Sequence, residues 1–276
     1  MLQFLKPIAF VFVLTAFFSC SSDDNSNPGE PDPLPDPETI TVLLPKRVVA
    51  FEDYFAKEEY TIDLNYTEDF LLSGFTLENN KGDKQVTKAE YEDGRLVKFH
   101  NNIGDPNSTV IFNYNDNNQL VGMEAAIMPT LHFSYNTNNQ VAEASMDQLL
   151  VSTYQYNALG NIEQAKIVIT APGQTVVEQR KFTYDNKNTP FKHTNYSFEL
   201  DASELLSEID FIYKPIHNIL TEKSDNGEDA ENLYNYTYEY IYNDHDFPTT
   251  VRKITPSGKI LEERIYEYEV HVIEVE

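Results

Sequence analysis

Along most of the chain, aromatic and aliphatic residues alternate with polar residues, and short polar tracts interrupt the alternation. The recurring unit is an aromatic residue, any residue, a tyrosine, a turn-forming tract and an aliphatic residue. Aromatic residues two positions apart lie on one face of a β-strand, because successive side chains point to opposite faces. Tracts rich in Asn, such as 115–118 and 136–139, tolerate the left-handed backbone angles of tight turns. Each unit therefore predicts a β-hairpin.

The tyrosines that mark the units are separated by 21 to 29 residues. They are Tyr91, Tyr114, Tyr135, Tyr156, Tyr184, Tyr213 and Tyr242. A hairpin cannot bury its apolar face alone, so these units are expected to pair with one another. The chain is therefore predicted to be all-β, a large antiparallel meander of about seven hairpins and fourteen strands. The meander either stays open or closes into a barrel-like sheet, with turns near residues 93, 116, 138, 159, 187, 216 and 245.

Two segments fit the pattern less well. In 39–84 the residues Tyr60, Ile62, Leu64 and Tyr66 alternate as in a strand, whereas 51–59 is expected to be a short helix or an irregular loop. A hairpin is expected within 196–213, with its turn at 201–204; a helical turn over 203–209 is the alternative.

The pattern of Tyr, turn, Gly or Asn, and an aliphatic residue resembles the YD repeat of the RHS family. The clearest matches are 91–96, 156–162 with Gly160, and 184–185. Most turns have Asn where the family prefers Gly, and no toxin-like C-terminal domain follows. A closed toxin-carrying shell is therefore not expected.

The N-terminus has the features of an export signal. An apolar run from Ile8 to Phe18 follows Lys6, is too short to span a bilayer and ends just before Cys20. Residues 1–19 are predicted to be a signal peptide. The segment 17–20 resembles a lipobox of Bacteroidetes lipoproteins, which implies that Cys20 is lipidated. The alternative is an ordinary signal peptide with an incidental cysteine.

Residues 20–38 are predicted to form a tether. They contain alternating prolines and several acids but no aromatic residue, so they cannot build a core. The start of this segment, 21–24, resembles an export tag that places Bacteroidetes lipoproteins on the cell surface; a solvated tether is the alternative.

Lipobox, tether and hairpins together resemble a group of Bacteroidetes lipoproteins of unknown function. This resemblance implies a porin-like antiparallel sheet in a single domain, 39–276, and a lipid-anchored, surface-exposed place on the outer membrane.

The formal net charge of −25 excludes nucleic acid and anionic lipid as expected partners, because such a surface repels both. The predicted outward faces carry Asn, Glu, Lys and Thr, and a membrane barrel needs apolar outward faces. We therefore expect the membrane to be contacted through the N-terminal lipid only. Cys20 is the single cysteine, so no disulfide is expected.

The strongest candidate binding feature is a stripe of five tyrosines on one strand face: Tyr234, Tyr236, Tyr238, Tyr240 and Tyr242. Tyrosine combines a flat apolar ring with a hydroxyl, so an exposed stripe would suit sugar rings or another protein chain as ligand. The alternative is a half-buried sheet face.

Two acidic tracts are weaker candidates for metal binding. Asp225, Glu228 and Asp229 offer oxygen ligands of the kind Ca²⁺ accepts, although their spacing lacks the register of a calcium loop. An ordinary acidic turn is the alternative. The tract 244–246 contains Asp, His and Asp, and no histidine pair has zinc-ligand spacing.

No catalytic motif is present: neither a Gly-x-Ser-x-Gly elbow nor a phosphate-binding glycine loop occurs. The sequence therefore predicts a lipid-anchored cell-envelope binding or structural module that uses no cofactor, apart from the Ca²⁺ considered above. The alternative is a secreted, lipid-anchored hydrolase of glycans or peptides, because its carboxylates could come from distant positions.

Overall fold

A computed structural model describes residues 38–53, 57–101, 108–126, 128–147, 149–194, 215–224 and 235–275. The predicted signal peptide, Cys20 and nearly all of the tether lie outside the described residues. So do the calcium candidates Asp225, Glu228 and Asp229, and Tyr234 at the start of the tyrosine stripe. None of the described residues forms a helix that is long and apolar enough to cross a bilayer.

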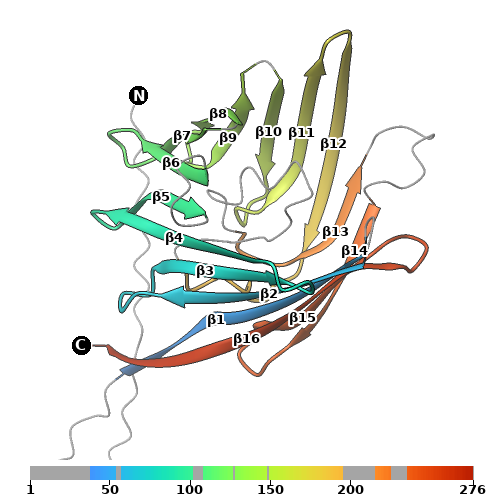
Figure 1. Ribbon diagram of the computed structural model, residues 1–276. Helices are drawn as coiled ribbons and strands as arrows, with labels where there is room; N and C mark the ends of the chain where they lie inside the picture. The colour runs from blue at the N-terminus through green and yellow to red at the C-terminus, as the bar shows by residue number, and fades with distance from the viewer. Residues whose placement is uncertain are drawn as a thin grey trace, which may run out of the picture.

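The chain folds into one closed antiparallel β-barrel of sixteen strands (Figure 1). The strands are β1 (Glu38–Asp53), β2 (Lys57–Tyr66), β3 (Leu72–Asn79), β4 (Lys84–Glu92), β5 (Arg95–Asn101), β6 (Thr109–Tyr114), β7 (Leu120–Ala125), β8 (Met128–Tyr135), β9 (Val141–Met146), β10 (Leu150–Tyr156), β11 (Ile162–Ala171), β12 (Gln174–Tyr184), β13 (Ile219–Ser224), β14 (Asn235–Tyr242), β15 (Pro248–Ile254) and β16 (Ile260–Val275). Each strand pairs with its neighbours in sequence, which confirms the predicted meander.

The barrel is closed by the pairing of the first strand with the last. β1 and β16 pair from Glu38 opposite Val275 to Glu52 opposite Glu262, with an irregularity between Pro45 and Arg47. In Figure 1 these two strands, blue and red, lie side by side along the lower part of the molecule. Closure pairs the first and last strands of the meander with each other, which protects those two edges from pairing with other chains.

Four of the turns that follow the marked tyrosines share one hydrogen-bonded geometry. In 115–119 the side-chain oxygen of Asn115 accepts the N–H groups of Asn117 and Gln119 at 3.0 and 2.9 Å. Equivalent bonds occur at Asn136, Asn157 and Asn243. The fourth turn residue is left-handed, with φ of 63° at Asn118. Asn adopts this conformation more readily than most residues, so it can replace Gly there.

A belt of eight tyrosines holds the strand ends together. Each hydroxyl donates a hydrogen bond to the carbonyl oxygen of a residue at or near the start of the preceding odd-numbered strand; in β1 the acceptor is Pro45, within the strand. The pairs are Tyr66–Pro45, Tyr91–Leu72, Tyr114–Leu96, Tyr135–Leu120, Tyr156–Val141, Tyr184–Ile162, Tyr240–Ile219 and Tyr268–Pro248. The distances range from 2.6 to 2.9 Å. The tyrosine belt thus repeats once in every even-numbered strand around the barrel.

The barrel interior is filled by apolar side chains over β1 to β11. Phe75, Phe99 and Phe112 are buried there, and the ring of Phe99 meets the other two edge-on. The outer wall carries ion pairs, for example Arg47–Asp63 at 2.6 Å and Lys98–Glu90 at 3.0 Å. Over β1 to β11, large apolar side chains therefore fill the interior, while these ion pairs lie on the outer wall.

Two expectations from the sequence were wrong. The structure has sixteen strands and not fourteen, and 39–84 contributes β1, β2 and β3 although its pattern is weak. Residues 51–53 and 57–59 belong to β1 and β2, which pair with each other and form no helix. The hairpin expected within 196–213, including Tyr213, lies outside the described residues. Because β12 pairs directly with β13, we call 185–218 the insertion between these two strands.

Candidate functional site

The inner wall of β12 to β16 differs from the rest of the interior because it buries charged side chains. We call this group the polar sector; its members are Glu178, Arg180, Glu222, Lys253, Glu262 and Arg264. It contains three acids and three bases, so its formal charge balances. Buried charges are costly unless they are paired, and each of these has a partner within the group or on a tyrosine ring.

Arg180 forms ion pairs with two carboxylates of the polar sector. Its guanidinium lies 2.6 Å from the carboxylate of Glu178 and 2.8 Å from that of Glu222, and it is 1% exposed. The second carboxylate oxygen of Glu222 accepts a hydrogen bond of 3.0 Å from the Tyr238 hydroxyl. Tyr238 is therefore fixed from β13 and presents its ring to the interior.

Lys253 lies over two tyrosine rings of β14. Its amine is 4.3 Å from the ring centre of Tyr236 and 5.9 Å from that of Tyr238. A cation over an aromatic ring is stabilised by the negative face of the ring, more strongly where water is absent. Glu262 and Arg264, next to it on β16, form a salt bridge.

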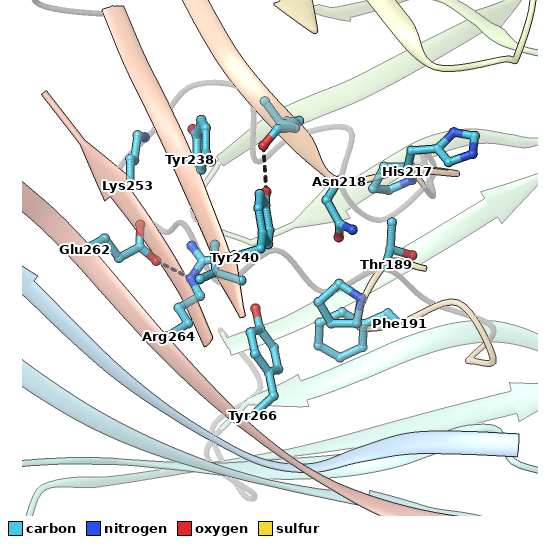
Figure 2. A pocket seen from close by; sticks show the side chains of 14 residues that line it. Thr189, Phe191, His217, Asn218, Tyr238, Tyr240, Lys253, Glu262, Arg264 and Tyr266 are labelled. Atoms are coloured by element: carbon cyan, nitrogen blue, oxygen red, sulfur yellow. Dashed lines mark hydrogen bonds and ion pairs between the residues drawn. The ribbon is translucent and has the colours of Figure 1, made fainter. Parts of the chain in front are cut away.

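A cavity lies between the polar sector and the described ends of the insertion, 185–194 and 215–218 (Figure 2). About 70 Å³ is accessible to the centre of a water-sized sphere, several times the roughly 10–15 Å³ that one water needs. In Figure 2, Lys253, Glu262 and Arg264 line one side and His217, Asn218 and Thr189 the other. The rings of Tyr238, Tyr240 and Tyr266 lie between them.

The tyrosine stripe of β14 faces this interior. Tyr236 is buried, and Tyr238, Tyr240 and Tyr242 are half-buried, while Thr237 and Glu239 on the opposite face are exposed. Tyr238 and Tyr240 line the cavity. The four described members thus form an inner wall and not an outer stacking surface.

Tyr242 and Asp185 fix the insertion to the barrel. One Asp185 oxygen accepts the backbone N–H groups of Lys187 and Asn218, at opposite ends of the insertion, both at 3.0 Å. The other oxygen accepts the Tyr242 hydroxyl and the side-chain N–H of Asn218. Burial, together with the hydrogen bond to this carboxylate, raises the pKa of Tyr242 well above its usual value. Asp185 therefore clamps both ends of the insertion to β14.

The described part of the insertion packs on β1 and β16. Phe191 is buried and meets Tyr266 edge-on, with 6.4 Å between ring centres. The Nδ1 atom of His193 accepts the backbone N–H of Leu43 at 2.9 Å, near the irregularity where β1 leaves β2. The insertion thus supplies a hydrogen bond that a strand would otherwise make, and it covers the cavity on that side.

Within the described ranges, no group of three or more His, Cys, Asp or Glu side chains is arranged to hold a metal. Asp246 of the tract 244–246 instead pairs with Lys187 at 2.6 Å. The cavity is lined by one carboxylate, Glu262, and one histidine, His217, on opposite sides in Figure 2. Glu262 is held by Arg264, and His217 lies 2.9 Å from Asn161, so the two are not arranged as an acid–base pair.

The fold is shared with solved structures from Bacteroides. One is a porin-like protein from Bacteroides vulgatus, with a TM-score of 0.54 and 13% identity over 83% of this chain and 99% of that chain. Another is a porin-like protein from Bacteroides uniformis, with a TM-score of 0.53 and 15% identity over 82% of this chain and 96% of that chain. No protein-family model and no curated protein matches the chain. The chain therefore has the porin-like β-barrel fold.

Sequence reasoning missed the polar sector and the insertion residues that cover it. A signal was present in β12, where Glu178 and Arg180 share a strand face with Phe182 and Tyr184. Charged residues in step with an aromatic alternation indicate buried ion pairs. No sequence signal relates Arg180 to Glu222, because 42 residues and the insertion separate them.

Proposed function

We propose that this protein is a lipid-anchored binding protein of the cell envelope, whose barrel stands in water and holds a small polar ligand in the cavity under its insertion. The observation that carries the proposal is the cavity, lined by three tyrosine rings and by buried, paired charges. Binding sites are commonly concave, mostly apolar and furnished with a few fixed polar groups.

A neutral sugar residue, free or at the end of a glycan, fits this lining best. Tyr238, Tyr240 and Tyr266 offer ring faces to the apolar face of a sugar. Thr189 and the side-chain oxygen of Asn218 offer hydrogen bonds to hydroxyls, whereas the Asn218 amide nitrogen already donates to Asp185 and Asn188. Of the polar sector, Lys253, Glu262 and Arg264 line the cavity. Glu262 is paired with Arg264, and the Lys253 amine lies over tyrosine rings, so these charges are already compensated, which favours a neutral ligand over an ion. The cavity is too small for a folded protein partner.

The outer wall of the barrel supports the proposal that the barrel stands in water. The ion pairs there, such as Arg47–Asp63, would lose their hydration in hydrocarbon, so the wall is suited to water. The membrane contact is proposed to be a lipid on Cys20, reached through the tether. The Bacteroides origin of the porin-like structures supports a place in a bacterial envelope.

The experiment is a titration of the full chain with glucose, galactose, mannose and N-acetylglucosamine. Binding is measured by saturation-transfer NMR and by calorimetry. Val251→Phe places a larger side chain in the cavity wall and is expected to abolish binding. Ile241→Phe, on the exposed face of β14, is the matched control and is expected to bind like the parent protein. Absence of binding to every sugar, or equal binding by both variants, would contradict the proposal.

The same titration separates binding from hydrolysis. A β-linked or α-linked disaccharide is incubated with the protein and its anomeric NMR signals are followed. The binding proposal expects an unchanged disaccharide, since Glu262 is the one carboxylate among the described residues that line the cavity. Release of the monosaccharides would favour the hydrolase.

A further inference from the structure

The last strand extends beyond its neighbour and has one free edge. β15 pairs with β16 only from Ile254 opposite Ile260 to Thr250 opposite Ile265. β16 continues to Val275 with β1 alone, as Figure 1 shows toward the C-terminus. Over 268–275, therefore, no described strand pairs with this edge of β16. Alternate residues of such an edge direct their N–H and C=O groups outward, which makes it a template for another strand.

The free edge is also apolar on one face. Val272 is 66% exposed and Val270 is 56% exposed, and both lie on the same face of β16. Free edges are usually protected by charged side chains, especially Lys, by Pro or by a bulge. Residues 267–275 contain neither Lys nor Pro, and their acids are Glu267, Glu269 and Glu274. Between Glu269 and Glu274 the exposed valines leave an apolar stretch of edge that favours a partner strand.

We propose that this edge pairs with the same edge of a second copy of the chain, antiparallel and around a two-fold axis at Val270. In this register Val270 lies opposite Val270, and Val272 lies opposite Tyr268. On the other face Glu269 lies opposite His271 of the second copy. Within one chain, the His271 Nε2 atom already lies 3.2 Å from a carboxylate oxygen of Glu269. In the dimer, each Glu269 would therefore have a histidine beside it on its own strand and another opposite it on the second copy.

Neighbouring registers are less favourable. An axis at Glu269 places the two Glu269 carboxylates opposite each other, and an axis at His271 does the same with the two imidazoles. An axis at Val272 places Val270 opposite Glu274. Like charges directly across a strand pair are destabilising, whereas opposite charges and β-branched pairs are stabilising. The register at Val270 alone combines both favourable contacts.

The contact between the two copies is short, because β15 already lies along this edge of β16 before Tyr268. It comprises the five residues from Tyr268 to Val272 on each copy. Such an interface is smaller than that of a stable dimer, so the dimer is expected to be weak and to depend on protein concentration.

The test uses disulfide trapping in the full chain carrying Cys20→Ala, which leaves no other cysteine. In the proposed register the two Val270 Cα atoms are about 4.5–5.5 Å apart, within the range of a disulfide. The two Val272 Cα atoms are displaced by four residues along the strands, about 13 Å. Val270→Cys is therefore expected to form a covalent dimer under mild oxidation. Val272→Cys, more exposed and on the same face, is the control and is expected to remain monomeric.

Sedimentation equilibrium of the Cys20→Ala chain provides an independent readout. Its mass is expected to rise toward twice the monomer mass with concentration, and Val270→Lys is expected to prevent the rise while leaving the far-ultraviolet circular dichroism unchanged. Equal trapping of both cysteine variants, faster trapping of Val272→Cys, or a monomer at every concentration would overturn the proposal. The proposal would also be overturned if Val270→Cys were protected from alkylation in a monomer, because another segment or another protein would then cover the edge.

Discussion

At the scale of single residues, the tyrosine belt shows how one hydroxyl stabilises the join between two strands. The hydroxyl of Tyr135 in β8 donates to the carbonyl oxygen of Leu120 at 2.8 Å. Tyr135→Phe removes the donor but keeps the ring, and leaves the carbonyl without that hydrogen bond. We expect the free energy of unfolding to fall by about 1 kcal/mol, measured by urea denaturation.

Tyr60→Phe is the matched control for this measurement. Its hydroxyl bonds Glu58 two residues away on the same strand and joins no other strand. We expect a change within about 0.5 kcal/mol. Equal losses in the two variants would show that the belt contributes no more than any other tyrosine hydroxyl.

At the scale of strands, Gly74 shows why one position of β3 has no side chain. It lies opposite Asn65 of β2 and Lys88 of β4. A Cβ atom on Gly74 would lie 2.3 Å from the carbonyl oxygen of Thr87, a backbone atom that cannot move without disturbing β4. We expect Gly74→Ala to lower the free energy of unfolding by about 2 kcal/mol or more, measured by urea denaturation.

Gly122→Ala in β7 is the control, because its added Cβ would meet Asn113 and Leu131 only at an ordinary 3.7 Å. Alanine has less backbone freedom to lose than glycine, so this variant is expected to be neutral or slightly more stable. Equal destabilisation by both substitutions would contradict the steric explanation.

The strands also show how much of the fold could be predicted from the sequence. The period of two and the Asn-rich turns predicted the hairpins of β4 to β11 and their turns, because both signals are local. The end repeats were missed: Tyr66 is followed by a turn without Asn or Gly, and Tyr268 lies within the long β16. In β14 the marked Tyr242 precedes its turn as predicted, but Tyr242 bonds Asp185 and Tyr240 joins the belt in its place.

The candidate site was predicted only in part for the same physical reason. The tyrosine stripe is a local pattern and was visible, but the sequence does not show which face of a strand points into a barrel. The partners of the stripe come from other strands and from the insertion, such as Glu222 for Tyr238. Such pairings depend on the order of strands in the sheet, which emerges only when the barrel closes.

At the scale of the whole molecule, the proposed anchor and the barrel are separate parts. Cys20→Ala removes the proposed site of lipidation, and the barrel contains no cysteine. We expect this variant to move from the detergent phase to the aqueous phase on Triton X-114 partitioning, with the circular dichroism of a β-sheet retained. Continued partitioning into detergent would show that another part of the chain contacts the membrane.

The whole barrel is also expected to lose stability in alkali, because several tyrosines titrate at higher pH when folded. Burial raises the pKa of Tyr135 to about 12, and it raises the pKa of Tyr66 and Tyr268 further still. A pKa raised in the folded state means that the folded protein retains protons that the unfolded chain releases from about pH 10 upward. The contribution of these tyrosines to the free energy of unfolding is therefore complete below about pH 10, and it declines as pH rises toward their pKa values in the folded state. Urea midpoints measured from pH 8 to pH 12 should stay level to about pH 10 and then fall, and Tyr135→Phe should fall less steeply than the parent protein. A midpoint that stays constant to pH 12 would show that the tyrosine belt is open to water.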